Sequence, residues 1–275
     1  MKRKFYLSIL TIITVMFFIT GAFSSSLALT AREVVQKADD RYDGDSSVSD
    51  TIMVLIDAKG NQRVRNLKGF SKDYGKDKKG VVFFLSPADV RNTAFLSYDW
   101  DDQSKEDDSW LYLPALQKVK RIASGKKSGS FMGSDFSYSD MNGMEINDWK
   151  YKFGKTESEI IDGHDTWVII GKPKKDRKQQ VVKETGYIKS QVWIRKDIFM
   201  VVRGKFWVKK GKKVKYLAVR DISKVGDIWT AHELNMKTTR KGKTEHSSII
   251  KLKNVQYNKG VDDSLFTTQR MERGL

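Results

Sequence analysis

The sequence predicts a mainly β protein built on one large antiparallel sheet that curls. About a dozen short segments rich in β-branched and aromatic residues follow one another, with tight turns between them. Many of these segments are apolar on both faces, as Thr51–Ile56 and Phe199–Val202 show. A sheet with one wet face would alternate apolar and polar residues. Something therefore covers each side of this sheet, or the curved sheet encloses a cavity.

The first residues predict export. The positively charged Met1–Lys4 precedes the apolar run Phe5–Phe23, and Ser24–Ala28 supplies the small residues of a cleavage site. We expect a signal peptide over residues 1–28, cleaved after Ala28, which leaves residues 29–275 as a single domain. An uncleaved inner-membrane anchor is the alternative, because the apolar run approaches the length of a spanning helix.

The composition narrows the class of partner. The chain has 51 Lys and Arg against 34 Asp and Glu, a formal net charge of +17, and no cysteine. No disulfide can hold the fold together, so it depends on its core. A basic exported protein is attracted to anionic surfaces, and contact with an anionic membrane surface is expected. Nucleic acid is not expected as a partner, because the chain is exported and shows no nucleic-acid-binding motif.

One amphipathic helix is expected near the start, over Ala31–Arg41, with Thr30 and Glu33 as a capping box. Antiparallel strands follow, and the end of the chain, Asp262–Arg270, has the pattern of a short capped helix. The polar segment Lys172–Glu184 is expected to be a hairpin tip or an interaction loop. The expected strands are Thr51–Asp57, Gln62–Phe70, Gly80–Leu85, Thr93–Tyr98, Ser109–Leu113, Lys118–Ile122, Asp148–Phe153, Asp165–Gly171, Tyr187–Ile194, Phe199–Val208, Lys213–Ile222, Ile228–Thr238 and Thr244–Leu252.

The segment Trp110–Met141 is the most informative of the chain. It joins an aromatic strand, a proline turn and a basic strand to a Gly/Ser-rich loop that contains several large apolar residues. Loops normally run over the surface, so the apolar side chains of this one need a cover. That cover is either the protein's own sheet or an apolar ligand.

Catalytic and metal sites are not expected. The three histidines, His164, His232 and His246, lack metal-ligand spacing, and no nucleophile elbow or phosphate-binding glycine loop occurs. The acidic run Asp99–Asp108 does not have the spacing of an EF-hand and is expected to be a solvated loop. No cofactor is expected.

The block Tyr112–Ile122, together with Gly129–Met141, resembles the hallmark segment of the LolA-like outer-membrane lipoprotein-sorting family. More narrowly, it is similar to the branch associated with RND-type transporters. The resemblance extends over the chain after Ala28 and includes a C-terminal Asp-x-x-Phe motif at Asp263–Phe266. It implies an incomplete, half-open β-barrel whose concave side is apolar and partly covered by helices. It also implies a periplasmic protein, and cargo that is a lipid or an acylated lipoprotein.

Two sets of site residues are predicted. Large apolar residues are expected to line or cover a cavity, with those of the Gly/Ser-rich loop acting as its lid; ordinary core packing is the alternative for each. Basic residues of one strand are expected to contact headgroups or a partner, or simply to guard a strand edge. The first set is Phe83, Phe95, Trp110, Tyr112, Phe131, Met132, Phe136, Met141, Trp193, Phe206 and Trp229, and the second is Lys118, Lys120 and Arg121.

The function predicted from these features is that of a non-enzymatic carrier of lipid or lipoprotein that works with a membrane transporter of the RND type. A second hypothesis is an accessory subunit that docks on a transporter and fills its cavity with its own side chains. A third is a lipid hydrolase, which would require a nucleophile within hydrogen-bond reach of one of the histidines.

Overall fold

In the computed structural model, which describes residues 28–102 and 104–275, the chain forms one antiparallel sheet with thirteen strands. Each expected strand is present, and most extend further than expected. The strands are β1 (Ser46–Asp57), β2 (Gln62–Tyr74), β3 (Asp77–Ser86), β4 (Ala94–Asp99), β5 (Asp108–Leu113), β6 (Lys118–Arg121), β7 (Trp149–Ile161), β8 (His164–Pro173), β9 (Tyr187–Arg195), β10 (Val201–Val208), β11 (Lys213–Val225), β12 (Ile228–Arg240) and β13 (Lys243–Tyr257).

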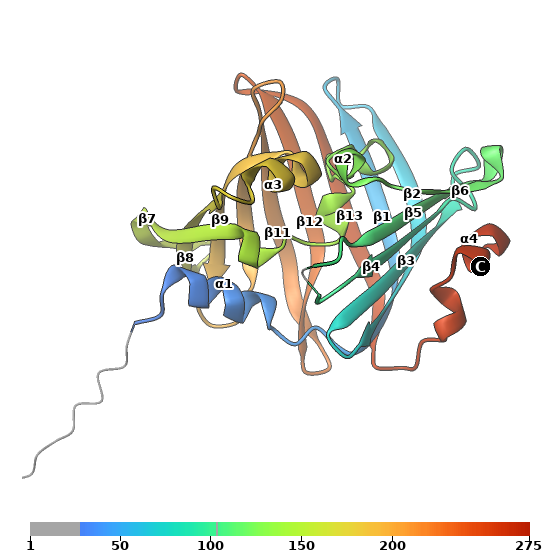
Figure 1. Cartoon of the computed structure of the whole chain (residues 1–275), viewed down its shortest axis with the longest axis horizontal. Coiled ribbons are helices and arrows are strands. Elements are labelled where there is room, and N and C mark those ends of the chain that lie inside the picture. The colour runs from blue at the N-terminus through green and yellow to red at the C-terminus, as the bar shows by residue number, and fades with distance from the viewer. Residues whose placement is uncertain (1–27, 103) are drawn as a thin grey trace, which may run out of the picture.

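The strand order is β6-β5-β4-β3-β2-β1-β13-β12-β11-β10-β9-β8-β7, so β6 and β7 form the two edges and the sheet stays open. The chain therefore builds two meanders, β1–β6 and β7–β13, in which each strand pairs with its sequence neighbour. The first and last strands join the meanders at the centre of the sheet, where Ile52 is opposite Lys251. Figure 1 shows the sheet curving around one side, which we call the inner face.

Short helices cover the two faces of the sheet (Figure 1). The α-helices are α1 (Ala31–Asp39), α2 (Ser124–Lys127), α3 (Lys178–Thr185) and α4 (Thr268–Arg273), and the 3-10 helices are η1 (Pro114–Leu116), η2 (Phe131–Gly133), η3 (Ser139–Met141), η4 (Ile146–Asp148) and η5 (Asp263–Leu265). The capping box predicted for α1 is present: the backbone N–H of Thr30 donates to Glu33 at 2.7 Å, and the N–H of Glu33 donates to Thr30 Oγ1 at 3.2 Å.

The prediction for Lys172–Glu184 needs a correction, because most of this segment is not a loop. Its start completes β8, and Lys178–Thr185 forms helix α3, which Gly186 ends in the left-handed conformation. Val181 is the residue that docks the helix, since it is buried against Trp149 and Tyr187. One apolar contact in an otherwise polar helix gives a weak periodic signal, so the sequence pattern did not reveal the helix.

Both faces of the sheet carry apolar clusters, as the two-faced strands predicted. Helix α1 packs Val34 on Ile169 and Ile194 of the inner face. On the outer face, the C-terminal segment packs Phe266 and Met271 on strands β3–β5. A curved sheet with apolar cover on both sides is thus the observed architecture, which confirms the predicted fold class.

No helix in residues 28–102 or 104–275 has the length and hydropathy to cross a membrane. The predicted signal peptide lies almost wholly outside the described residues, which begin at Ala28.

Candidate functional site: a cavity beneath the aromatic loop

A cavity of about 360 Å³ lies between the inner face of strands β1–β4 and β12–β13 and the loop that follows β6. This volume is within the range of pockets that hold small molecules. The wall is mainly apolar and includes Met53, Leu67, Leu234, Ile250 and Leu252.

Small residues leave this space open. Ser49 of β1 is paired with Gly69 of β2, and Ser71 of β2 is paired with Gly80 of β3. A methyl group on Gly69 would lie 3.3 Å from Ser49 Oγ, so these two residues are closely packed. Larger side chains at these positions would fill the cavity, because strand residues with the same parity share a face.

The loop closes the cavity with aromatic side chains. Phe131 and Phe136 are 1% and 5% exposed, and both belong to the cluster that contains Met53, Phe84 and Phe95. The rings of Phe131 and Phe95 meet edge to face, with centroids 5.2 Å apart, a favourable aromatic geometry. The loop is therefore part of the apolar core and, at the same time, one wall of the cavity.

Asp135 fastens the loop to strand β13. Its carboxylate accepts from Ser248 Oγ at 2.8 Å and lies 2.7 Å from His246 Nδ1. Its backbone N–H donates to Ser248 Oγ at 3.0 Å. The carboxylate is only 2% exposed, and a buried carboxylate is costly unless it is paired and hydrogen-bonded.

Asp140 makes a second attachment, to strands β9 and β11. It accepts from the hydroxyl of Tyr187 on β9 at 2.8 Å and from Lys215 on β11 at 3.2 Å. Burial and the Asp140 charge raise the pKa of Tyr187 well above its usual value, so this hydroxyl stays protonated and donates. A third contact runs from Arg65 of β2 to the carbonyl of Met132. We call these three contacts the loop attachments.

Five residues of the predicted cavity set gather here. Phe95, Phe131, Phe136 and Met141 line the cavity, and Met132 packs against the same cluster. The structure thus brings together the aromatic residues that the sequence singled out, and their role in ligand binding stays a prediction. The polar residues that attach the loop were not predicted. The one sequence feature that could have indicated them is strand parity, which places the strand residues among them on the inner face. They are Asp135, Asp140, His246, Ser248, Lys215 and Arg65.

The remaining predicted residues lie elsewhere. Phe83, Trp110 and Tyr112 are on the outer face, packed with the C-terminal segment, because strand alternation turns them away from Phe84 and Leu111. Trp193 also packs outward, with Val168 and Val202.

Two further aromatics lie apart from the loop. Phe206 is on the inner face in a separate cluster, where its ring stacks on Tyr187 with centroids 5.1 Å apart. Trp229 is near the start of β12, with Lys224 and Arg195 over its ring at 5.6 and 5.8 Å.

The predicted headgroup contacts lie on β6, which is an edge of the sheet. Lys118, Lys120 and Arg121 are exposed. Arg121 forms an ion pair with Asp108 of the neighbouring strand. Lys118 and Lys120 therefore present positive charge along an open strand edge. This position is compatible with contact to headgroups or a partner and with protection of the edge against pairing.

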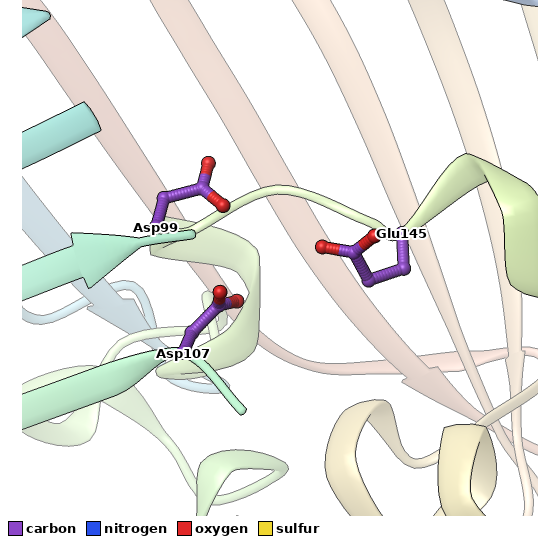
Figure 2. A group of neighbouring side chains, drawn as sticks. All are labelled: Asp99, Asp107 and Glu145. Carbon is purple, nitrogen blue, oxygen red and sulfur yellow. The ribbon is translucent and has the colours of Figure 1, made fainter. Parts of the chain in front are cut away.

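An acidic cluster lies beside the loop (Figure 2). Carboxylate oxygens of Asp99, Asp107 and Glu145 are within 4.8 Å of one another. Burial, together with the neighbouring carboxylates, raises the pKa of Asp99 and of Glu145 to about 7. Three oxygens at this spacing could ligate a hard cation, but the raised pKa values indicate that bound protons relieve the repulsion near neutral pH. The acidic run is therefore not simply a solvated loop.

His246 and Ser248, which share the carboxylate of Asp135, do not form a catalytic relay. In a Ser-His-Asp triad, the serine hydroxyl donates to the imidazole. Here Ser248 donates to Asp135, and His246 contacts the same carboxylate. The geometry suits attachment of the loop rather than activation of a nucleophile.

The comparisons with known proteins place this chain in a class and then in a family. A family model described as that of an uncharacterized protein matches residues 76–273. No curated protein sequence matches the chain. Among solved structures, the chain is similar to a domain from Vibrio parahaemolyticus described as an outer-membrane lipoprotein-sorting protein domain. The identity is 30%, with 88% of this chain and 98% of that chain covered and a TM-score of 0.77.

Two further structures agree. A DUF1329 family protein from Desulfovibrio piger is 28% identical over 88% of this chain and 97% of its own, with a TM-score of 0.77. A LolA superfamily protein from Nitrosomonas europaea is 18% identical over 88% and 99%, with a TM-score of 0.64, which supports the fold. The class is that of open, curved β-sheets with a covered inner face. The chain belongs to the LolA-like family of outer-membrane lipoprotein-sorting proteins.

Proposed function

We propose that this chain is a non-enzymatic periplasmic carrier that holds a lipid, or the acyl chain of a lipoprotein, in the cavity beneath the aromatic loop. The observation that carries the proposal is the apolar cavity of about 360 Å³, which Phe131 and Phe136 cover and small residues keep open. Membership of the LolA-like family and the printed description of the Vibrio parahaemolyticus relative support the same function.

The energetics of acyl transfer explain why such a cavity is needed. Removing an acyl chain from a bilayer forfeits about 0.8 kcal/mol per buried CH₂. A carrier must replace that burial with apolar surface of its own. Met53, Leu67, Ile250 and Leu252 supply it, and Met141 adds a side chain that adapts to irregular ligands.

A cavity-filling variant tests the proposal. Ser97 lines the cavity and makes only a long hydrogen bond, 3.5 Å to the carbonyl of Gly80. We expect Ser97→Leu to weaken binding of a fluorescent fatty acid at least about tenfold, because one buried side chain changes binding by several CH₂ equivalents. The control is Ser223→Leu at an exposed position of β11.

The binding measurements can contradict the proposed carrier function or the proposed site. If wild-type protein neither binds the fatty acid nor carries co-purified lipid in native mass spectrometry, the carrier function is excluded. If both variants bind as the wild type does, the ligand occupies another site.

The loop attachments favour a second candidate function. Asp135, Asp140 and Arg65 hold the loop at three points, and Phe131 is 1% exposed, as expected of a permanent plug. In that case the protein is an accessory subunit that docks on a membrane transporter of the RND type. Hydrogen exchange separates the two candidates: exchange of residues 131–141 that depends on added fatty acid supports the carrier, and uniformly slow exchange supports the plug.

The remaining features of the proposal concern location. We propose that residues 1–28 are a signal peptide, that residues 29–275 form the single domain, and that Lys118 and Lys120 contact anionic headgroups or a partner. The exposed position of both lysines at the β6 edge supports that contact. N-terminal sequencing of protein recovered from the periplasm tests cleavage after Ala28.

A further inference from the structure

The outer face of strands β9–β13 carries a groove of about 860 Å³, larger than the inner cavity and separated from it by the sheet. Its orientation follows from the strand register. Leu217 and Met236 pack on the inner face. Tyr216 and Lys237 are their neighbours in sequence, and Arg203 precedes Gly204, which is paired with Leu217. Side chains alternate along a strand, so Tyr216, Lys237 and Arg203 point outward.

Four cations meet in this groove. They are Arg203 and Lys205 on β10, Arg220 on β11 and Lys237 on β12. Among the ion pairs of the described residues, none involves these four side chains, whereas the one acid in the groove, Glu233, is paired with Lys251 at 3.0 Å. Arg220 is directly opposite Glu233 in the register, whereas Arg203, Lys205 and Lys237 have no acidic residue opposite them. The groove therefore carries an excess of positive charge, which favours an anionic occupant.

Aromatic rings hold the lysine ammonium groups in place. Lys205 Nζ lies 4.8 Å from the ring centroid of Trp207 and 5.5 Å from that of Tyr216. Lys237 Nζ lies 5.7 Å from the Tyr216 centroid on the other side. Cation–π contacts of this kind position the charges before a partner arrives, which reduces the entropy lost on binding.

We propose that this groove is a docking site for an extended acidic segment of a partner protein. The groove is concave, so a flat bilayer would meet its rim, whereas an extended chain can reach Trp193 and Tyr216 inside it. The cations are distributed over three neighbouring strands, and an extended segment that crosses them can place several carboxylates in register. Because the inner cavity is on the other face of the sheet, docking leaves that cavity free. The inference therefore stands independently of the proposed carrier function.

Charge reversal at exposed groove residues tests the site. The probe is a fluorescein-labelled twelve-residue peptide of alternating Glu and Ser with a central Phe, and the protein is the chain from Leu29 to Leu275. We expect binding in fluorescence anisotropy at 50 mM salt that weakens at least tenfold at 200 mM. The double variant Arg203→Glu/Lys237→Glu is expected to lose at least tenfold in affinity. The control Lys175→Glu/Lys178→Glu, with the same change of charge at exposed positions around α3, is expected to stay within twofold.

Three outcomes would overturn the inference. Equal losses in the groove variant and the control would show that only net charge matters. Loss of binding to phosphatidylglycerol vesicles in the groove variant, with peptide binding intact, would show that the groove serves a lipid surface. Unchanged binding by the groove variant in both assays would remove the groove as a site.

Two controls distinguish loss of the groove from loss of the fold. Arg203→Gln/Lys237→Gln removes the charges without introducing new ones, and it is used in place of the Glu variant if circular dichroism shows that the latter does not fold. Fatty-acid binding by the groove variant is expected to equal that of the wild type, so failure of the groove and failure of the inner cavity give different results.

Discussion

Asp135 shows how one residue ties the loop to the sheet. It is a buried carboxylate in a Gly/Ser-rich loop, and both of its side-chain partners come from β13. An apolar loop could rest on the sheet in several positions, since the hydrophobic effect is not directional. A hydrogen-bonded carboxylate fixes a single position, and this explains the ordered packing of Phe131 and Phe136.

Removal of this attachment should loosen the loop. We expect His246→Ala to lower the free energy of unfolding by about 1–3 kcal/mol, because it leaves the Asp135 carboxylate without one of its partners. Urea denaturation measures the change, and hydrogen exchange should accelerate in residues 131–141. His164→Ala, at the exposed first residue of β8, is the control. Equal stability of the two variants would show that Ser248 alone is sufficient.

The acidic cluster should make stability depend on pH. The pKa of Asp99 is raised to about 7 in the folded state, mainly by burial and then by Asp107 and Glu145. In the unfolded chain it returns to about 3.9. The folded state therefore binds more protons between these values, and the free energy of unfolding falls as the pH rises from about 4 to about 7.

Neutralising Asp99 should remove part of this dependence. We expect Asp99→Asn to raise the free energy of unfolding at pH 8 by on the order of 1 kcal/mol, after allowance for solvent screening, and to change it less at pH 5. Thermal melts at the two pH values provide the measurement. Asp102→Asn, an exposed carboxylate whose pKa is lowered by Ser104, should not stabilise the protein at pH 8.

At the scale of elements, the C-terminal segment acts as a cover for the outer face. Met271 of α4 is fully buried, and Phe266 is 1% exposed. Together they cover Phe83 and Tyr112, which the sequence had suggested for the cavity. The hydroxyl of Tyr98 donates to the carbonyl of Phe266 and joins this segment to β4.

Truncation of one buried side chain tests that role. We expect Met271→Ala to cost about 2–5 kcal/mol of stability, as buried large-to-small changes do. Fatty-acid affinity should not change, because the sheet separates this cluster from the cavity. Reduced affinity in a folded Met271→Ala protein would contradict the assignment of the two faces.

Much of the element pattern could be predicted, because hydrophobic runs and turn residues are local signals. The thirteen strands and the α1 capping box were found in this way. The sequence did not show which face of the sheet each side chain occupies. Runs such as Val81–Leu85 are apolar at every position, and alternation along a strand does not say which set of side chains is on the inner face. The loop attachments were missed because Asp135 and His246 meet only in the folded chain.

At the scale of the whole molecule, the open edges of the sheet are exposed to pairing with other chains. Strand β6 ends one side and carries Lys118 and Lys120, both exposed. Charged side chains on an edge oppose such pairing.

Loss of these edge charges should promote association. We expect Lys118→Val/Lys120→Val to form dimers or larger species at concentrations where the wild type is monodisperse. Analytical ultracentrifugation measures this, and Lys175→Val/Lys178→Val, at exposed positions outside the strands, is the control. Association of both variants to the same extent would point to general loss of solubility.

The joint between β1 and β13 has a consequence for how the chain is made. Every other strand pair joins strands that are consecutive in the sequence, but Ile52 pairs with Lys251, which is synthesised near the end of the chain. Until then β1 presents an open edge, and closing so long a loop is slow. The two meanders can therefore join only after nearly the whole chain has been made, and we expect the N-terminal half to be prone to pairing with other chains until β13 is available.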